Sequence, residues 1–237
     1  MKHLIPDYFN FLIPVAIQDP VRIGNNEDGG YLVPRAIIDR SEGLLGLGLG
    51  DNYTFEEDYR KLKPTAPIHL YDGTVNGEHW PEPKRSKYLE FFNDAVHHRQ
   101  NVGKDNIVSA LDQLGVKNIL LKADIEYGEY EIIDDLWANA DRIIAIVMEF
   151  HGCYKGSEQF KRAVEKFNEL YEIVHIHGNN HTGMRDGIHN CMELTFVRRD
   201  LVTDFTPRHD YYLPGLDFSN RPGQEDQYGY FQAPTNN

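Results

Sequence analysis

Three ionisable side chains follow two apolar segments of strand length: Asp124 ends the segment 118–124, and Glu149 and His151 follow 143–148. The carboxyl ends of parallel strands meet at one edge of a sheet, where α/β proteins bind their ligands. Because histidine titrates near neutrality, His151 is the candidate base for a hydroxyl proton. Asp124 and Glu149 are candidates to orient it or to hold hydroxyl groups. Each also has a structural interpretation: a helix cap for Asp124, an ion pair for Glu149, a hydrogen-bonded loop residue for His151.

The same three groups offer two carboxylates and an imidazole, which can bind Mg²⁺ or Mn²⁺ and acidify a hydroxyl. A second set of imidazoles lies at His175, His177, His181 and His189. Alternation along a strand places only His175 and His177 on one face. Zinc is disfavoured, because no cysteine has ligand spacing and no tight His-x₃-His pair is present. The sequence leaves the metal unknown.

A glycine-rich run is the strongest sign of a cofactor site. Gly46, Gly48 and Gly50 alternate in the apolar stretch 44–50, and an acidic segment that can begin a helix follows. Strand, tight turn and helix in this order let backbone approach a ligand closely. The dinucleotide spacing G-x-G-x-x-G is absent, so a cofactor without phosphates, such as S-adenosylmethionine, is favoured over one with a pyrophosphate. Close packing of the strand is the structural alternative.

Polar residues at the next two predicted strands fit the same site. Asp72 ends the strand 68–72, about 22 residues after Gly50, where α/β nucleotide sites place the acceptor for ribose hydroxyls. Asn93 and Asp94 lie near the end of a predicted strand over 88–96, from which they can contact an adenine edge. Asp72 is alternatively a turn former before a glycine.

Four further residues are candidates for substrate binding. Arg22 and Tyr31 flank the turn Asp28-Gly29-Gly30, whose chemistry predicts a hairpin. Glu126 follows the fourth predicted strand, and His177 follows the sixth. All four therefore lie near the ligand edge or in the loop that precedes the core.

The apolar segments alternate with helical patterns and predict an α/β fold with about seven strands and helices on both faces. The chain divides into an N-terminal preamble with a hairpin (1–42), a core (43–203) and an irregular C-terminal tail (204–237). The predicted strands are 43–49, 68–72, 88–96, 118–124, 143–148, 171–176 and 191–198.

Five segments together carry a family resemblance: DGGY, GLGLGDNYTFEED, LYDGT, LKADIEYGEYEII and VMEFHG. They resemble the FkbM-type methyltransferases, small S-adenosylmethionine-dependent enzymes associated with bacterial surface polysaccharides. The most specific segment is 122–131, similar to the family's K-x-D-x-E-G-x-E pattern, here with Tyr127 inserted between the glutamate and the glycine. Ala123 stands where the family commonly has a larger apolar residue.

The resemblance implies a Rossmann-like seven-stranded methyltransferase sheet whose seventh strand is antiparallel. It also implies that the methionine and ribose of the cofactor lie over the glycine turn and Asp72, with the adenine near Asn93 and Asp94. The expected activity is O-methylation of a sugar, free or nucleotide-activated, or of another small hydroxylated precursor of a surface glycan. An NAD-dependent oxidoreductase or epimerase and a non-catalytic nucleotide-binding module are the alternatives.

Composition limits the partners. The 237 residues carry a net charge of −13, which disfavours binding to nucleic acid or anionic lipid. No apolar run approaches the roughly 18 residues of a membrane span. The two cysteines lack metal spacing and predict buried thiols in a reducing compartment, so we expect a cytoplasmic protein. A homo-oligomer is compatible with the sequence.

Overall fold

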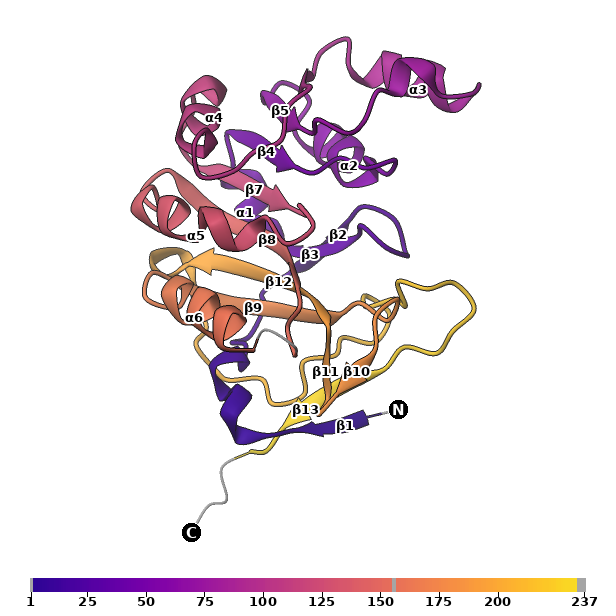
Figure 1. Cartoon of the computed structure of the whole chain (residues 1–237). Coiled ribbons are helices and arrows are strands. Elements are labelled where there is room, and N and C mark those ends of the chain that lie inside the picture. Colours follow the sequence, from indigo (N-terminus) through magenta and orange to yellow (C-terminus); the bar gives the residue numbers. More distant parts are fainter. Residues whose placement is uncertain (1, 155–156, 234–237) are drawn as a thin grey trace.

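A seven-stranded sheet forms the centre of the protein in a computed structural model that describes residues 2–154 and 157–233. Its strand order is β6-β5-β4-β7-β8-β12-β9 (Figure 1). The strands are β4 (Gly43–Leu47), β5 (Ile68–Tyr71), β6 (Val96–His98), β7 (Ile119–Ala123), β8 (Ile143–His151), β9 (Tyr171–Gly178) and β12 (Cys191–Arg198).

The direction of the strands follows the Rossmann pattern with one addition. Strands β6, β5, β4, β7 and β8 pair in parallel, whereas β12 pairs antiparallel with both β8 and β9. If the seven strands of this sheet are numbered as they follow one another along the chain, their order across the sheet is 3-2-1-4-5-7-6. The order reverses between β4 and β7, and such a switch point opens a crevice at the carboxyl ends of the strands. This sheet confirms the predicted fold class.

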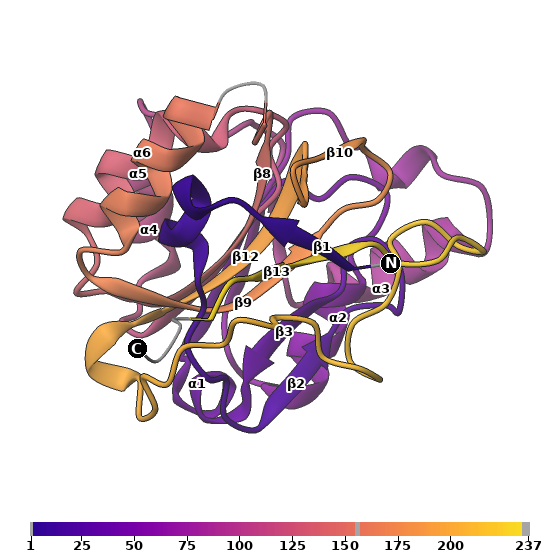
Figure 2. The ribbon, with the colours of Figure 1, turned by 90° about the horizontal axis from the view of Figure 1, so that it is seen from below.

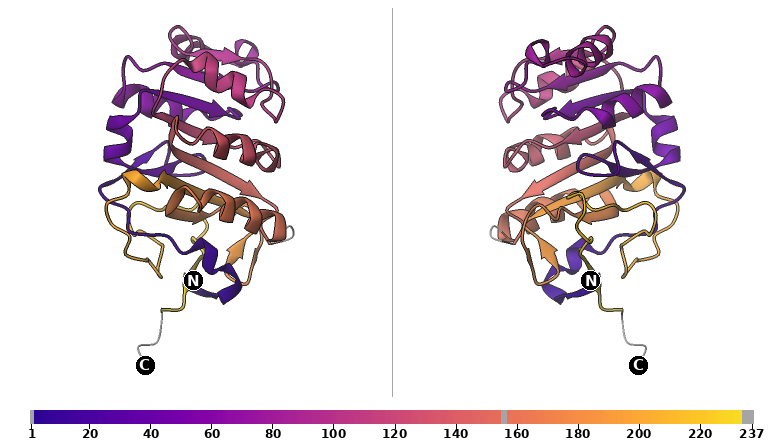
Figure 3. Two further views of the ribbon diagram at one scale, coloured as in Figure 1. Left: turned by 90° about the vertical axis from the view of Figure 1, so that its left-hand side faces the viewer. Right: turned by 90° about the vertical axis from the view of Figure 1, so that its right-hand side faces the viewer.

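Helices cover both faces of the sheet because successive strand residues point to opposite sides. In β4, Leu45 and Leu47 pack into the core under α4, α5 and α6, whereas Leu44 packs into the core under α1, α2 and α3 (Figures 1 and 3). The helices are α1 (Arg35–Arg40), α2 (Thr54–Leu62), α3 (Lys84–Phe91), α4 (Ile107–Leu114), α5 (Glu129–Ala138) and α6 (Ser157–Phe167). The 3₁₀ turns are η1 (Asp7–Leu12), η2 (Gly77–His79) and η3 (Arg199–Leu201).

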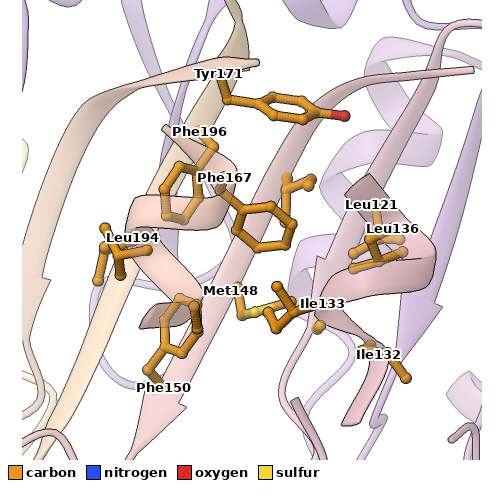
Figure 4. Packing of buried hydrophobic residues seen from close by; sticks show 14 of the residues in the cluster. Leu121, Ile132, Ile133, Leu136, Met148, Phe150, Phe167, Tyr171, Leu194 and Phe196 are labelled. Carbon is orange, nitrogen blue, oxygen red and sulfur yellow. The ribbon is translucent and has the colours of Figure 1, made fainter. Parts of the chain in front are cut away.

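Helix α6 shows how the helical pattern produces packing. Phe160, Val164 and Phe167 recur at helical spacing and are fully buried. Phe167 packs on Phe196 of β12, with ring centroids 5.2 Å apart (Figure 4). Each buried side chain of this size contributes about 1.5–3 kcal/mol, so this face holds β8 and β12 firmly in place.

The predicted third strand over 88–96 is wrong. Residues 84–91 form helix α3, and the strand β6 begins only at Val96. Tyr88 and Phe91 are both buried at a helical spacing of three residues, and both contact the ring of Tyr53. An aromatic-rich segment of this length satisfies strand and helix propensities alike, and packing against the α2 side of the sheet decides for the helix.

Segments outside the central sheet pair in three small sheets. The hairpin expected around Asp28-Gly29-Gly30 is β2 (Pro20–Ile23) with β3 (Tyr31–Pro34). Strand β1 (Lys2–Ile5) pairs in parallel with β13 (Tyr228–Phe231) in the tail, so the two ends of the chain run side by side (Figure 2). The third pair is β10 (Met184–Arg185) with β11 (Ile188–His189). Residues 234–237 of the predicted tail lie outside the described residues.

None of the helices in the described part of the chain combines the length and apolar character needed to cross a bilayer.

Candidate functional site

The turn after β4 is closed by Asp72. One carboxylate oxygen of Asp72 accepts the backbone N–H groups of Leu49 (2.9 Å) and Gly50 (3.0 Å), and the other accepts the N–H and hydroxyl of Thr74 (2.7 and 2.6 Å). Burial alone would raise the pKa of Asp72, but these hydrogen bonds lower it below its ordinary value. The carboxylate is therefore held ionised at the end of β5 and fixes the shape of the glycine turn.

Gly48 is the glycine that the turn requires. Its φ is +80°, and a Cβ at this position would lie 1.7 Å from the carbonyl oxygen of Asp124. Its own carbonyl accepts a hydrogen bond from Lys122 Nζ at 3.0 Å. Gly50, with φ +56°, has open space around its missing Cβ. Gly46 has a different role, since a Cβ there would lie 2.3 Å from Leu70 Cδ2, so the close-packing interpretation describes it.

A cleft of about 530 Å³ opens between the β4 turn and the loop after β7; we call it the switch-point cleft. Four carboxylates line it, and among its described lining residues there is no Lys, Arg or His. The lining residues are Gly48, Tyr71, Asp72, Thr74, Asn101, Val102, Asp124, Ile125, Glu126, Tyr127, Gly128 and Glu131. Its walls thus carry negative charge, which favours a cationic ligand.

Asn93 and Asp94 do not line this cleft. They follow helix α3 and precede β6, which puts them at the amino end of that strand. Asn101 and Val102, which follow β6, line the cleft instead. Because the error arises from the misplaced third strand, the same rule about strand ends would have selected Asn101 if the strand had been assigned correctly.

A buried ion pair between Lys122 and Glu56 contacts the β4 turn at the Gly48 carbonyl. Lys122 of β7 is 4% exposed, and its ammonium lies 3.9 Å from the carboxylate of the fully buried Glu56 of α2. Burial lowers the pKa of Lys122, but the charge of Glu56 and the smaller contributions of other nearby carboxylates together outweigh it, and the pKa is raised. The pair therefore holds a cation against the Gly48 carbonyl. The sequence signal for Lys122 was a charged residue inside an otherwise apolar strand.

The loop after β7 adopts an unusual backbone at Glu126 and Tyr127. Glu126 (φ +51°) and Tyr127 (φ +76°) are both left-handed, a conformation rare for residues other than glycine. This conformation directs the carboxylate of the exposed Glu126 toward His151, and Glu126 Oε2 lies 3.3 Å from His151 Nε2. The Tyr127 ring lies 5.3 Å from the His151 ring, centroid to centroid. Backbone strain of this kind gathers at functional sites.

His151 is held between two carboxylates. Its Nδ1 lies 3.2 Å from Oε1 of the fully buried Glu129, and its backbone N–H donates to the same oxygen at 2.6 Å. Burial alone would lower the pKa of His151, but the Glu129 hydrogen bond and charge raise it to about 9. The side chain is therefore an imidazolium at neutral pH, and it must lose a proton before it can act as a base.

The structure brings Asp124, Glu149 and His151 together. Ligand atoms of Asp124, Glu126 and His151 lie within 4.8 Å of one another, and the same limit holds for Glu149, His151 and Cys191. Burial raises the pKa of Glu149 well above its ordinary value, and the charges of Asp124 and Glu193 raise it further. Both cysteines are free and buried, and the Cys191 thiol donates to Glu149.

A second acidic group, which we call the carboxylate cluster, consists of Asp28, Glu149 and Glu193. Glu149 of β8 and Glu193 of β12 are direct cross-strand partners, and both are buried. Asp28 reaches them from the β2–β3 hairpin. Asn179 donates to Asp28 (3.1 Å) and Glu149 (2.8 Å), and Asn220 of the tail donates to Asp28 (3.1 Å) and Glu193.

The other predicted substrate residues surround this cluster. Arg22 donates to the carbonyls of Asn25, Glu27 and Leu216, and so ties the hairpin to the tail. The Tyr31 hydroxyl is buried, and burial together with the charges of the cluster raises its pKa well above the ordinary value. Two residues of this region were not predicted from the sequence. Glu193 could have been found as the single acidic residue within the apolar segment 191–198, whereas Asn220 has no recognisable signal in the tail.

The histidines of β9 pair with carboxylates. His177 contacts Glu193 at 3.3 Å and Asp226 at 3.1 Å, and His175 lies 2.9 Å from Asp217. The four histidines noted in the sequence, of which only His175 and His177 were expected to share a face, are not among the groups of described residues whose ligand atoms converge. Burial alone would lower the pKa of His177, but Asp226 and Glu193 raise it well above its ordinary value. These contacts of His175 and His177 therefore link β9 to the tail.

Comparison with known proteins gives likeness in fold. No protein-family model matches the chain, and no curated protein sequence matches it either. The chain is similar to the fibrillarin pre-rRNA processing protein of Methanococcus jannaschii, with a TM-score of 0.44 and 11% identity over 68% of each chain. It is also similar to a putative methyltransferase from Thermoplasma acidophilum, with a TM-score of 0.40 and 9% identity over 68% of this chain and 70% of that one. Precorrin-6Y C5,15-methyltransferase from Geobacter metallireducens is similar with a TM-score of 0.38 and 12% identity, over 68% of this chain and 84% of that one.

Proposed function

We propose that the protein is an S-adenosylmethionine-dependent O-methyltransferase that acts on a sugar or on another small hydroxylated precursor of a surface glycan. The observation that carries the proposal is the charge of the switch-point cleft. Its wall includes the carboxylates of Asp72, Asp124, Glu126 and Glu131. The sulfonium and ammonium groups of S-adenosylmethionine are attracted to such a wall, and the volume of about 530 Å³ suits a ligand of this size.

The same wall argues against NAD, whose pyrophosphate carries two negative charges. Pyrophosphates bind at free backbone N–H groups of a glycine turn. Here the N–H groups of Leu49 and Gly50 already donate to Asp72. An anion at this turn would meet a carboxylate instead of donors.

On the acceptor side, Asp124, Glu149 and His151 are the residues proposed to handle the hydroxyl group. S-adenosylmethionine supplies a methyl group on a positively charged sulfur. The acceptor oxygen forms a bond to that methyl carbon while the carbon–sulfur bond breaks, and the hydroxyl proton passes to a base on the protein. His151 fills this role once deprotonated, and Asp124 and Glu149 orient the hydroxyl. We include Arg22, Tyr31, Glu126 and His177 as the acceptor surroundings.

The surface-glycan substrate rests on the FkbM resemblance of segments 28–31, 46–58 and 122–131, and on the acidic acceptor side, whose carboxylates and amides suit sugar hydroxyls. We also propose a cytoplasmic location, which the two buried free thiols support.

Titration calorimetry with S-adenosylmethionine, its demethylated product and NAD tests the cofactor. We expect binding of the first two. Asp72→Asn removes the charge that fixes the turn, and we expect it to weaken cofactor binding at least about tenfold. Asp51→Asn is the matched control, since Asp51 lies in the same turn but is exposed and pairs with Lys84. Preference for NAD would end the proposal.

Labelled methyl donor with a panel of nucleotide-activated sugars tests the reaction. His151→Ala is expected to lower kcat by about 10²–10⁴-fold while the cofactor Kd stays within about twofold. In the unmodified protein, kcat/KM should rise with pH toward about 9, because the imidazole of His151 becomes a base only as it deprotonates. Cofactor binding without any methylated product would favour a non-catalytic nucleotide-binding module.

A further inference from the structure

The carboxylate cluster places three carboxyl groups close together, two of them buried. Oxygen atoms of Asp28, Glu149 and Glu193 all lie within 4.8 Å of one another. Glu149 and Glu193 face each other directly across β8 and β12, where like charges are destabilising. Their exposed fractions are 5% and 3%, so water screens this repulsion little.

Neutral donors and cations both surround the cluster. Asn179 and Asn220 contribute amide N–H donors, and Cys191 contributes a thiol. His177 touches one oxygen of Glu193 and is shared with Asp226, and a ring nitrogen of His151 lies within 4.8 Å of Glu149. These groups surround the three carboxyl groups without separating them, and an ion bound between them would contact all three directly.

Two buried oxygen atoms beside the cluster indicate which kind of cation it suits. The Tyr31 hydroxyl belongs to a side chain that is 3% exposed, and it has no hydrogen-bond partner among the described residues. The cluster's three carboxylates and Asp124 are the charges that act on this hydroxyl. The side-chain oxygen of Asn220, a residue 2% exposed, likewise has no partner in the described part of the chain. Its amide nitrogen bonds both Asp28 and Glu193.

We propose that Asp28, Glu149 and Glu193 bind a divalent cation of the oxygen-preferring class, Mg²⁺, Mn²⁺ or Ca²⁺, next to the acceptor side of the cleft. Three carboxylates with further oxygen atoms nearby form the ligand set that these hard cations select. The exposed Asp28 carboxylate provides the opening to solvent. Resting on the proposed function, the cation would hold and acidify the acceptor hydroxyl.

The neighbouring group of Glu149, His151 and Cys191 is the competing site, because its nitrogen and sulfur atoms suit zinc. Both nitrogens of His151 already face carboxylates, those of Glu129 and Glu126. The Cys191 thiol donates its hydrogen to Glu149 and is buried among negative groups, which opposes the thiolate that zinc requires. The all-oxygen cluster is therefore the better site.

Titration with Mn²⁺, followed by the loss of its free-ion electron paramagnetic resonance signal, tests the site. We expect one Mn²⁺ per chain, and Asp28→Asn and Glu193→Gln should each weaken its affinity at least about tenfold. Glu126→Gln is the matched control: it removes an acid from the other carboxylate–imidazole group, Asp124, Glu126 and His151. It should leave Mn²⁺ affinity unchanged.

Asp28→Asn keeps the test decisive if the buried Glu193 variant does not fold, because Asp28 is exposed on a hairpin loop. Circular dichroism of each variant verifies the fold. Absence of Mn²⁺ binding at millimolar concentration overturns the proposal, as does loss of binding in Glu126→Gln with Asp28→Asn unaffected. Zn²⁺ binding that outcompetes Mn²⁺ and disappears in Cys191→Ser also overturns it.

Titration with S-adenosylmethionine on the same samples separates this proposal from the proposed function. Mn²⁺ binding that depends on Asp28 without any cofactor binding supports the cation site and counts against the methyltransferase. Cofactor binding without Mn²⁺ binding gives the reverse result.

Discussion

The switch-point cleft and the carboxylate cluster lie at the same edge of one sheet but are built differently. Most lining residues of the cleft come from the turns and loops that directly follow β4, β5, β6 and β7, while Tyr71 ends β5 and Glu131 belongs to α5. The cluster joins the hairpin residue Asp28 to β8 and β12, and Asn220 of the tail closes over it. Charges in the cleft face an open cavity, whereas those of the cluster are mostly buried and paired. Each cleft residue is thus placed locally, by the strand that it ends or follows, and the cleft is open. The cluster depends on contacts between distant segments and is mostly buried.

This difference has an energetic consequence. The exposed cleft carboxylates of Glu126 and Glu131 keep part of their hydration, so removal of either costs little stability, whereas Asp72 is buried and holds the turn. In the cluster, each buried charge depends on its partners, and removal of one partner leaves the other uncompensated. Substitutions on the cluster side should therefore affect folding, and those on the cleft side mainly ligand binding, except where backbone geometry is at stake.

The largest effect is expected for His177→Ala. His177 lies between the buried Glu193 and the partly buried Asp226, and its loss leaves both carboxylates without their shared cation. We expect the free energy of unfolding at pH 6.5 to fall by about 3–5 kcal/mol. Because the folded-state pKa is raised, this contribution is complete below the unfolded pKa and declines as pH rises through the folded value. Urea denaturation followed by circular dichroism measures the change.

His181→Gln is the control for this prediction. His181 is exposed and its ring contacts only the carbonyl of Asn220 among the described partners, so its loss should cost within about 0.5 kcal/mol. Equal costs for the two variants would contradict the distinction between buried and open regions.

Gly48→Ala tests the one place where the cleft side should also be sensitive. The added Cβ would meet the Asp124 carbonyl at 1.7 Å in a left-handed backbone, so the β4 turn and the β7 loop must move apart. We expect a loss of about 2–4 kcal/mol in stability together with loss of cofactor binding. Denaturation and calorimetry measure the two.

Gly50→Ala separates backbone strain from the clash. Gly50 is also left-handed, but its Cβ position is open, so about 1 kcal/mol is expected. If Gly50→Ala cost as much as Gly48→Ala, contact with Asp124 would not be the reason that Gly48 is required.

The local character of the cleft explains why the sequence predicted it well. Alternating apolar strands followed by glycine or acid placed Gly48, Asp72 and Asp124 at one edge from the pattern alone. The error at 88–96 arose where aromatic residues fit strand and helix equally, and only packing on Tyr53 distinguishes the two. The carboxylate cluster could not be predicted from the sequence for another reason. The pairing of Glu193 with Glu149 depends on strand register, and the position of Asn220 depends on the path of an irregular tail.

A smaller effect than those of His177→Ala and Gly48→Ala is expected for His151, which lies between the two regions. Its pKa is raised to about 9 from an ordinary value of 6.5, so it contributes stability that is complete below about pH 6.5 and is lost as pH rises through about 9. We expect His151→Gln to lower the free energy of unfolding by about 1–2 kcal/mol at pH 6, after allowance for solvent screening. The difference from the unmodified protein should shrink toward zero by about pH 10.

Urea denaturation of both proteins at the two pH values makes this measurement. Glu126→Gln is the companion variant, because Glu126 is exposed and contacts His151 Nε2, whereas Glu129 is buried and contacts Nδ1. If Glu129 dominates, Glu126→Gln should leave most of the pH dependence intact. A difference between His151→Gln and the unmodified protein that grows with pH would mean that the folded-state pKa of His151 lies below 6.5. The pH rise expected for methyl transfer would then level off below pH 6.5 instead of near 9.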